Sequence, residues 1–367
     1  MKTLILLSHT PNPRAMKRIK LLNENNIELF IIYARRKKNL NFMFTLPKGV
    51  ESKEIFYNDT SFLLRLFSLL KLMIFSIYSI KAFKPNIIHL TNLDMLICAS
   101  IYKKFFNKKV KIIYEVADIP EMIITKNENT VTKGIKKIEG KLCKDIYKLI
   151  LTSPKYYDAY YCNFIEKEKV FFMPNVPSQK VFQSYKKKKS GIFTIGFIGF
   201  IRYFDAMQTL INAVKQIPDI KLLFIGDGMD AQSLQVYAES INANNVEFKG
   251  KYDYETEIAF LYGQIDLVYS AYDNRSNNSK IALPNRLYEA IVCELPIIVS
   301  EGTYLWDLVK AMEIGEAVDP FNVDNIINTI TMMRQDNYYI EYVSHCHEIK
   351  TQYYLEERNK ELIKLYC

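Results

Sequence analysis

Short apolar runs that alternate with helical patterns are the feature that most restricts the fold of this 367-residue chain. Polar or helix-breaking residues bound each run, and the regular hairpin turns of an all-β protein do not occur between them. Strands that alternate with helices in this way indicate βαβ units and parallel sheets. The runs of the first series are TLILLS, ELFIIYA, NIIHLT, VKIIYEV and KLILTS, and those of the second are FTIGFIGF, IKLLFIGDG, VEFKG, IDLVYSAYD and PIIVS.

A charged run, Lys186–Lys189 followed by Gly191, separates the two series and is interpreted as a linker. The chain is too long for one ordinary core. We therefore predict an α/β protein with two Rossmann-like, doubly wound parallel-sheet domains, residues 1–185 and 191–340, facing each other across a cleft. A ligand would bind at the carboxyl ends of the strands. Residues 341–367 are helical and amphipathic, and either brace the two domains or form a last layer on the second.

The composition is that of a globular protein, with 49% hydrophobic and 24% charged residues. Six cysteines are scattered without a CxxC pair, so we interpret them as reduced thiols in a cytosolic protein, with neither a disulfide framework nor a zinc site. The opening MKTLILLSHTPNPR has too short an apolar part, and becomes basic too soon, for a signal peptide; a first buried strand is expected there instead.

The charge is divided unevenly along the chain. Residues 1–190 contain 35 Lys and Arg against 15 Asp and Glu, whereas residues 191–367 contain 14 against 25. The basic half is suited to an anionic membrane surface, and lysine drift in an AT-rich genome is an equally good explanation. No basic motif is interleaved with aromatic residues, so nucleic acid is not an expected partner.

The segment 61–84, SFLLRLFSLLKLMIFSIYSIKAFK, is apolar enough to resemble a transmembrane span. Arg65 and Lys71 lie inside it and would be costly at a bilayer centre. On a helix, Arg65, Ser68, Ser76 and Ser79 fall on one stripe, which predicts an amphipathic helix. Such a helix is either packed on the sheet by its apolar face or laid on lipid headgroups.

The stretch KIALPNRLYEAIVCELPIIVS, residues 280–300, combines a helix start with polar residues that a core helix does not need. Pro284 suits the first turn of a helix, whose free N–H groups and dipole attract an anion. Arg286 can hold a diphosphate, and Glu289, three residues later on the same face, can accept from the hydroxyls of a ribose. Asn285 adds a donor. The plain structural alternative is that Arg286 and Glu289 pair with each other.

These residues carry a resemblance that extends over most of the chain. ALPNRLYEAIVCELPIIVS resembles the donor-binding segment of GT-B glycosyltransferases, in particular the capsule and exopolysaccharide members of the large retaining family four. IGFIGFIRYFDAMQTLINAVKQIPDIKLLFIGDG is similar to the family's first strand, phosphate loop, helix and next strand. VEFKGKYDYETEIAFLYGQIDLVYSAYD resembles the part that follows, including the base-binding loop. KPNIIHLTNLDMLICASIYKK, KIIYEVADIP and VFFMPNVP resemble parts of the acceptor domain and the stretch before the crossover.

The resemblance implies a donor site in the second domain, holding a nucleotide diphosphate sugar, most simply a UDP-sugar, without a metal or cofactor. The turn at Gly199 lets backbone approach a pyrophosphate, and Arg202 supplies charge; the alternative is a tight turn with no ligand. This chain has Phe200 and Asp205 where relatives carry basic residues, and Ile281 where they carry a first glutamate. The remaining implied neighbours of the nucleotide are Gly226, Asp227, Gly228 and Tyr252, of which the glycines are turn residues first.

In the first half, Asp118 follows a predicted strand and is the candidate catalytic acceptor residue, since a carboxylate there can bind or deprotonate an acceptor hydroxyl. A helix N-cap is the alternative role. Alternation would send Glu115 to the opposite face. Further candidates on the acceptor side are His89, Asp94 and Arg14. Relatives often have a histidine where this chain has Ala117, and the pair His345 and His347 lacks a third ligand for a metal.

The expected function is transfer of a sugar, with retention of configuration, from a nucleotide diphosphate sugar to a lipid-linked saccharide acceptor in capsular or exopolysaccharide synthesis. The protein would be cytoplasmic and peripheral on the inner face of the cell membrane. Two alternatives stay open: a non-catalytic nucleotide-sugar-binding or scaffold subunit, and a nucleotide-sugar 2-epimerase. The four histidines of the chain make the epimerase less favoured.

Overall fold

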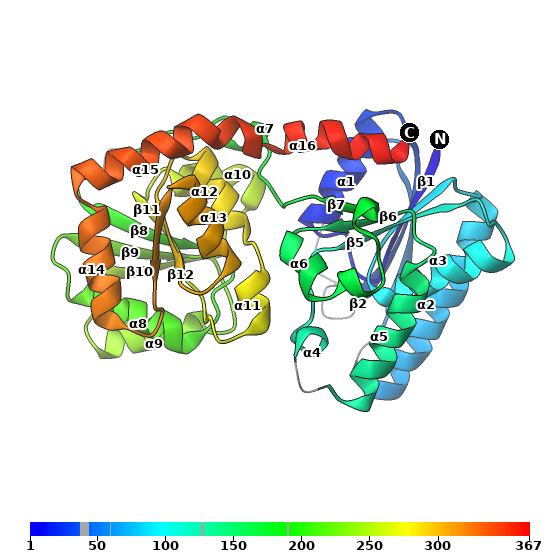
Figure 1. The fold of residues 1–367 in the computed structure, drawn as a ribbon, viewed down its shortest axis with the longest axis horizontal. Coiled ribbons are helices and arrows are strands. Elements are labelled where there is room, and N and C mark those ends of the chain that lie inside the picture. Colours follow the sequence, from blue (N-terminus) through cyan, green and yellow to red (C-terminus); the bar gives the residue numbers. More distant parts are fainter. Residues whose placement is uncertain (37–43, 59, 126–127, 189–190) are drawn as a thin grey trace. The chain divides into compact units, whose positions relative to one another are not determined.

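The computed structural model describes residues 1–36, 44–58, 60–125, 128–188 and 191–367. They divide into two compact units. The first unit comprises Met1–Met173 together with Asn359–Cys367, and the second comprises Pro174–Arg358 (Figure 1).

The first unit contains a seven-stranded parallel sheet in the order β3-β2-β1-β4-β5-β6-β7. The reversal of strand order between β1 and β4 is the switch point at which such sheets bind ligands. Its strands are β1 (Lys2–Leu7), β2 (Glu28–Arg36), β3 (Glu51–Tyr57), β4 (Ile87–Thr91), β5 (Lys111–Val116), β6 (Lys148–Leu151) and β7 (Val170–Phe172). Its helices are α1 (Pro13–Glu24), α2 (Phe62–Phe83), α3 (Leu93–Phe105), α4 (Glu121–Ile124), α5 (Thr130–Cys143) and α6 (Pro154–Ala159), with 3₁₀ turns η2 (Tyr161–Asn163) and η3 (Lys167–Lys169).

The second unit contains a six-stranded parallel sheet in the order β10-β9-β8-β11-β12-β13, with its switch point between β8 and β11. Its strands are β8 (Phe193–Ile198), β9 (Ile220–Ile225), β10 (Val246–Gly250), β11 (Leu267–Ser270), β12 (Ile297–Ser300) and β13 (Gly315–Val318). Its helices are α7 (Gln179–Phe182), α8 (Phe204–Lys215), α9 (Ala231–Ser240), α10 (Tyr254–Tyr262), α11 (Asn277–Ile281), α12 (Asn285–Val292), α13 (Tyr304–Met312), α14 (Val323–Met333) and α15 (Asp336–Ile349).

The predicted doubly wound α/β architecture is confirmed, and each strand-like run of the sequence forms a strand. The sequence analysis missed the edge strands β3, β7 and β13. In β3, ESKEIFY, polar or charged side chains occupy the first four positions and only Ile55 and Tyr57 are buried. An edge strand has one neighbour to pair with, so it tolerates a polar sequence that hides it from a hydrophobicity pattern.

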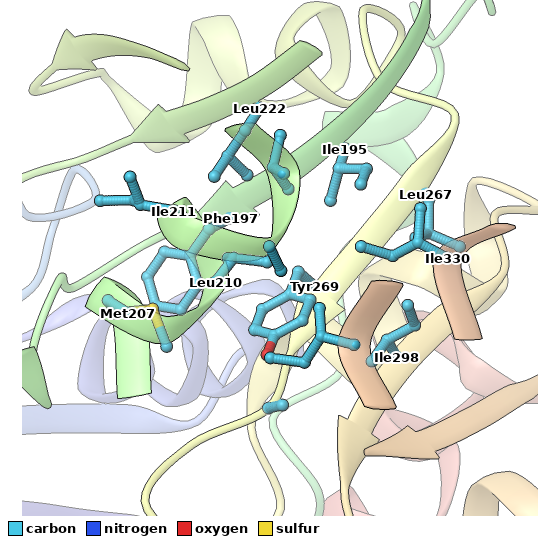
Figure 2. Packing of buried hydrophobic residues seen from close by; sticks show 14 of the residues in the cluster. Ile195, Phe197, Met207, Leu210, Ile211, Leu222, Leu267, Tyr269, Ile298 and Ile330 are labelled. Carbon is cyan, nitrogen blue, oxygen red and sulfur yellow. The ribbon is translucent and has the colours of Figure 1, made fainter. Parts of the chain in front are cut away.

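Helices pack on the second sheet through apolar side chains that recur with helical spacing. Met207, Leu210 and Ile211 of α8 are fully buried. Figure 2 shows them beside Phe197 of β8 and Leu222 of β9. Gly199, one of the candidate donor residues, directly follows β8 of this core.

The division between the units differs from the predicted boundary at residues 185–191. Pro174 and the residues after it group with the second unit. Tyr185 donates its hydroxyl to the carbonyl of Cys293 at 2.7 Å, and the amide of Lys188 donates to Gly263 at 2.8 Å. The basic run is therefore attached to the second unit as far as Lys188; Lys189, its last residue, lies outside the described residues.

The C-terminal segment is a broken helix. α15 is followed by η4 (Lys350–Tyr353), α16 (Leu355–Leu362) and η5 (Ile363–Tyr366). The division between the units falls within α16, after Arg358, so that only the last residues, from Asn359, group with the first unit. The predicted bracing segment 341–367 is thus shared between the two units.

Candidate functional site

The donor-side candidates lie in the second unit and begin with the turn that ends β8. Gly199 has a φ of 127°, which a residue with a side chain rarely adopts. A Cβ there would lie 3.0 Å from Nη2 of Arg286. The glycine thus makes room for the guanidinium, which the sequence analysis had placed at the same site.

Gly226 and Gly228 serve close packing between two loops. A Cβ on Gly226 would lie 2.0 Å from the carbonyl oxygen of Gly199, and one on Gly228 would lie 1.9 Å from that of Ile201. The amide of Ile201 donates to the carbonyl of Asp227 at 2.9 Å. These glycines are turn residues first, as expected, and they place the loops after β8 and β9 against each other.

Arg286 is buried, with 6% of its surface exposed, and faces the end of β8. Its Nε donates to the carbonyl of Ile198, and its guanidinium carbon lies 3.8 Å from the ring centroid of Phe197 and 5.2 Å from that of Tyr272. Within the described residues its Nη1 has no hydrogen-bond partner. A buried guanidinium with an unused donor beside a glycine turn is suited to receive an anion.

Glu289 is also buried, and two tyrosines bind its carboxylate. The hydroxyls of Tyr254 and Tyr262 each donate to it at 2.8 Å. The expected alternative, a pair between Glu289 and Arg286, is therefore not what holds either side chain. An ionised carboxylate has about four acceptor positions, so two tyrosines leave capacity for further donors. Burial, followed by the charge of Glu289, raises the pKa of Tyr252 to about 12.

The other donor-side candidates are exposed. Arg202 stacks its guanidinium on the ring of Tyr203, 4.8 Å from the centroid. The Oδ1 of Asn285 accepts from Nδ2 of Asn175 at 2.8 Å. Asp227 accepts from the amide of Gly228, and its Oδ2 lies 3.3 Å from Nζ of Lys251. Both contacts lower the pKa of Asp227.

The N-terminus of α12 differs in detail from the prediction. Pro284 is the N-cap residue, with φ −77° and ψ 154°, and the helix begins at Asn285. Proline makes no side-chain cap, so the first amides of α12 are not satisfied by a cap. They remain suited to an anion.

In the first unit, a cavity of about 470 Å³ lies at the carboxyl ends of β1, β4 and β5. Asp118, after β5, lines it and is exposed; its Oδ1 accepts from the hydroxyl of Tyr156 at 3.0 Å. The N-cap residue of α4 is Pro120, so the alternative role of Asp118 as that helix's cap does not apply. Arg14 and His89 also line the cavity.

Glu115, which strand alternation had assigned to the opposite face, lines the same cavity and is buried. Arg14 donates to it through Nε, Arg18 through Nε at 3.1 Å and Nη2 at 3.0 Å, and Nε2 of His89 lies 2.9 Å from it. Burial alone would raise the pKa of Glu115, but the charges of Arg18 and Arg14 and the contact with His89 hold it well below the usual range. The carboxylate is thus ionised and anchors both arginines. Arg14 also donates to the carbonyl of Met173 at 2.8 Å.

A second buried carboxylate, Glu139 of α5, lines the cavity and is held by hydroxyls alone. Tyr114 and Tyr161 donate to its Oε1 at 2.9 and 3.1 Å, and Tyr160 donates to Oε2 at 2.8 Å. Burial, reinforced by this carboxylate, raises the pKa of each tyrosine.

Two acceptor-side candidates have structural partners. His89 stacks on Tyr366, with ring centroids 5.9 Å apart, and its Nδ1 contacts the tyrosine hydroxyl, so it packs between that ring and Glu115. Asp94 accepts from the amide of Met95 at 2.9 Å, and burial raises its pKa. Neither the pair His345 and His347 nor any other described group of residues could hold a metal ion.

Sequence reasoning missed Arg18, Glu115, Glu139 and the tyrosines that bind the two glutamates. Arg18 follows Arg14 by four positions on α1, so the two share a helix face. This spacing was a usable signal. Tyr254 and Tyr262 lie on one helix, α10, and Tyr160 and Tyr161 are adjacent in the chain. The glutamate that each pair binds lies on another element, so no local pattern brings the partners together.

One family model matches part of this chain. Residues 177–352 match the family described as glycosyl transferases group 1. The matched segment lies inside the second unit and contains Gly199, Arg286 and Glu289. The similarity to this family therefore covers the part of the second unit that holds the candidate donor residues.

One curated relative matches across both units. Succinoglycan biosynthesis protein ExoL of Rhizobium meliloti (strain 1021) is 24% identical over 259 residues, which are 67% of this chain. These residues cover 64% of that protein, which is less than two thirds of its length.

Solved structures match the whole chain and show the fold. Sucrose-phosphate synthase from Thermosynechococcus elongatus matches with a TM-score of 0.77 at 16% identity, covering 100% of this chain and 98% of that one. Anabaena Alr3699/HepE in complex with UDP matches with a TM-score of 0.75 at 14% identity, covering 100% and 99%. A UDP-N-acetylglucosamine 2-epimerase matches with a TM-score of 0.63 at 11% identity, covering 98% and 94%. The predicted GT-B architecture is confirmed.

Proposed function

We propose that this protein is a glycosyltransferase that moves a sugar from a nucleotide diphosphate sugar to a saccharide acceptor during exopolysaccharide synthesis. The observation that carries the proposal is the buried guanidinium of Arg286, whose Nη1 has no partner within the described residues and which lies against the Gly199 turn. That turn lies inside the segment that matches group 1 glycosyl transferases. A nucleotide diphosphate supplies the anion that such a group lacks.

On the donor side, Arg286 and the first amides of α12 would stabilise the diphosphate as it leaves, which is the largest electrostatic demand of the reaction. Glu289, oriented by Tyr254 and Tyr262, would accept from the ribose hydroxyls. Arg202 is exposed and would add charge at the rim. We propose UDP as the nucleotide of the donor, because HepE is seen in complex with UDP. Transfer would retain configuration and use protein cations rather than a metal.

On the acceptor side, the cavity of the first unit suits hydroxyl groups. Asp118 and Glu139 supply carboxylate acceptors, while Arg14 and Arg18 are occupied by Glu115. Carboxylates and tyrosine hydroxyls recognise a neutral saccharide better than an anion. Asp118 would bind the acceptor hydroxyl and receive its proton as the new bond forms. The relative named for succinoglycan biosynthesis supports a polysaccharide as the product. A lipid carrier on the acceptor saccharide is a further part of the proposal.

The test is a transfer assay in which the purified chain is incubated with membrane extract and a panel of labelled UDP-, GDP- and ADP-sugars. We expect label to enter the lipid-extractable fraction with one donor class. Glu289→Ala should abolish transfer, whereas Glu239→Ala, an exposed carboxylate on α9, should leave it unchanged. Interconversion of the donor sugar without transfer would identify an epimerase. Nucleotide-sugar binding with no chemistry under any condition would support the scaffold alternative.

A further inference from the structure

Helix α2 has its large apolar side chains turned away from the protein. Along Phe62–Phe83, exposure reaches 67% at Phe67, 66% at Ile74 and 69% at Tyr78. A soluble protein rarely exposes so long a row of large apolar groups on one helix. The exposed members of the row are Leu63, Leu64, Leu66, Phe67, Leu70, Ile74, Phe75 and Tyr78.

The serines of the same helix face inward. Ser76 and Ser79 are buried, and neither hydroxyl has a hydrogen-bond partner in the described structure. The predicted polar stripe is therefore split, with Arg65 exposed and these serines buried. The inward face of α2 is thus mixed, and most of its large apolar side chains do not contribute to the core.

The apolar surface continues onto the end of α3, which contacts both α2 and α5 (Figure 1). Phe105 is 69% exposed and Phe106 49% exposed. The ammonium of Lys81, in the last turn of α2, lies 5.0 Å from the ring centroid of Phe106 and joins the two parts. We call the exposed row of α2 together with Phe105 and Phe106 the apolar face.

Positive charge surrounds the apolar face. Helix α2 contains no carboxylate, and its cations Arg65, Lys71 and Lys81 are all exposed. In α5 the one carboxylate, Glu139, is buried beneath tyrosines, so the charged side chains that face outward are all cations. The cations of α5 and of the last turn of α3 are Lys103, Lys104, Lys133, Lys136, Lys137 and Lys141.

We propose that the apolar face docks on an anionic lipid bilayer, with α2 lying in the headgroup region. Apolar side chains enter the boundary between headgroups and acyl chains, while the surrounding cations contact lipid phosphates. Charge complementarity selects this occupant over a second copy of the chain, because two copies would bring cations against cations. The inference goes beyond the proposed function and does not depend on it.

The same helix is long and apolar enough to cross a bilayer by length and composition. It is nevertheless built into the first unit. Leu72 and Ile80 are fully buried, and Ser68 accepts from the amide of Asn58 at 3.0 Å. A spanning helix would have to leave β1, β2 and β3, which α2 contacts. An interfacial position keeps those contacts.

The experiment is vesicle flotation of the full chain. Vesicles of phosphatidylcholine with phosphatidylglycerol should carry the protein to the top of the gradient, and phosphatidylcholine alone should not. Phe67→Ser with Ile74→Ser should weaken binding about tenfold or more, since both side chains lose buried apolar area. Phe260→Ser, a residue 67% exposed on the second unit, is the matched control and should bind as the wild type. Equal flotation of both variants would overturn the proposal.

A second pair of measurements tests the charge and the depth of insertion. Lys71→Glu should weaken binding to anionic vesicles by about fivefold or more, and added salt should reduce wild-type binding. Alkaline carbonate should release the protein from membranes; resistance to it would mean a spanning helix and would overturn interfacial docking. Light scattering that shows a dimer broken by the Phe67 and Ile74 changes, without vesicle binding, would assign the face to a second copy. The vesicles contain no saccharide, so the vesicle-binding results can be interpreted even if the transfer assay fails.

Discussion

Arg286 and Glu289 are three positions apart on α12, and each is held by different partners. The arginine lies over the ring of Phe197 with one donor unused, whereas the glutamate is bound by two tyrosines. A buried guanidinium without a carboxylate partner is costly in an empty protein, since its desolvation is not repaid. That cost is explained when an anionic ligand completes the site.

The first prediction concerns this residue. Arg286→Met should weaken binding of a nucleoside diphosphate by about 10- to 100-fold, the effect of losing a charge-assisted hydrogen bond. The free energy of unfolding should change by less than about 1 kcal/mol, because methionine removes a buried charge while keeping apolar contact. Calorimetric titration with UDP, GDP and ADP measures the first effect and urea unfolding the second. Arg334→Met, a half-buried arginine on the same unit, is the control, and equal affinity of the two variants would contradict the assignment.

A second prediction at this scale concerns Glu115 and pH. Its pKa is lower in the folded than in the unfolded protein, so its stabilising contribution is present above the unfolded pKa, about 4.3. It is lost as the pH falls through the lower, folded pKa. Glu115→Gln leaves Arg14 and Arg18 without a counterion and should cost about 3–5 kcal/mol at neutral pH.

The variant should therefore lose less stability than the wild type when the pH is lowered from 5 to 3. Hydrogen exchange in β5, followed against pH, checks this in the first unit. Glu51→Gln, an exposed position at the sheet edge, should show the wild-type dependence. If protection from hydrogen exchange in β5 falls equally with pH in the wild type and in Glu115→Gln, Glu115 is not an ionised carboxylate in the folded protein.

At the scale of elements, the positions of side chains depend on how loops and helices pack rather than on their own sequence. The loops after β8 and β9 come together because Gly226 and Gly228 have no side chain. Helix α2 exposes its apolar row and buries its serines. The first feature shapes the proposed diphosphate site, and the second forms the proposed lipid surface.

Glycine substitutions test the packing of the two loops. Gly226→Ala should destabilise the second unit by about 3 kcal/mol or more, because its φ is 132° and a Cβ would overlap the carbonyl of Gly199. Gly134→Ala in α5, where nothing lies within 4 Å, should instead stabilise by up to about 1 kcal/mol through helix propensity. Urea unfolding followed by the fluorescence of Trp306 measures the effect in the second unit, and hydrogen exchange in α5 measures it in the first. Similar stability of both variants would show that the loops are not in contact.

At the scale of the whole molecule, the chain returns its last residues to the unit in which it began. Leu362 is fully buried, Tyr366 is almost so, and the tyrosine stacks on His89 of β4. The first unit is therefore completed only when the far end of the chain is present.

Truncation after Arg358 tests this. The first unit should lose about 5 kcal/mol, because three apolar side chains, Leu362, Leu365 and Tyr366, are removed from its surface. Hydrogen exchange should rise in β4 and β5 and stay unchanged in β8 and β9. Tyr366→Phe keeps the ring and should cost only about 1 kcal/mol for its hydrogen bond. Uniform loss of protection in both units would show that the segment stabilises the chain in another way.

The sequence by itself determined the two parallel sheets, because buried parallel strands read as continuous apolar runs wherever they occur. It also indicated Gly199, Arg286 and Glu289, since a turn glycine and a helix face are local features. Only the tertiary structure decided that Glu115 joins Arg14, Arg18 and His89, and that Glu139 collects three tyrosine hydroxyls. It also decided which way α2 faces. These arrangements join residues from separate elements, and a pattern along the chain does not show which distant residues meet.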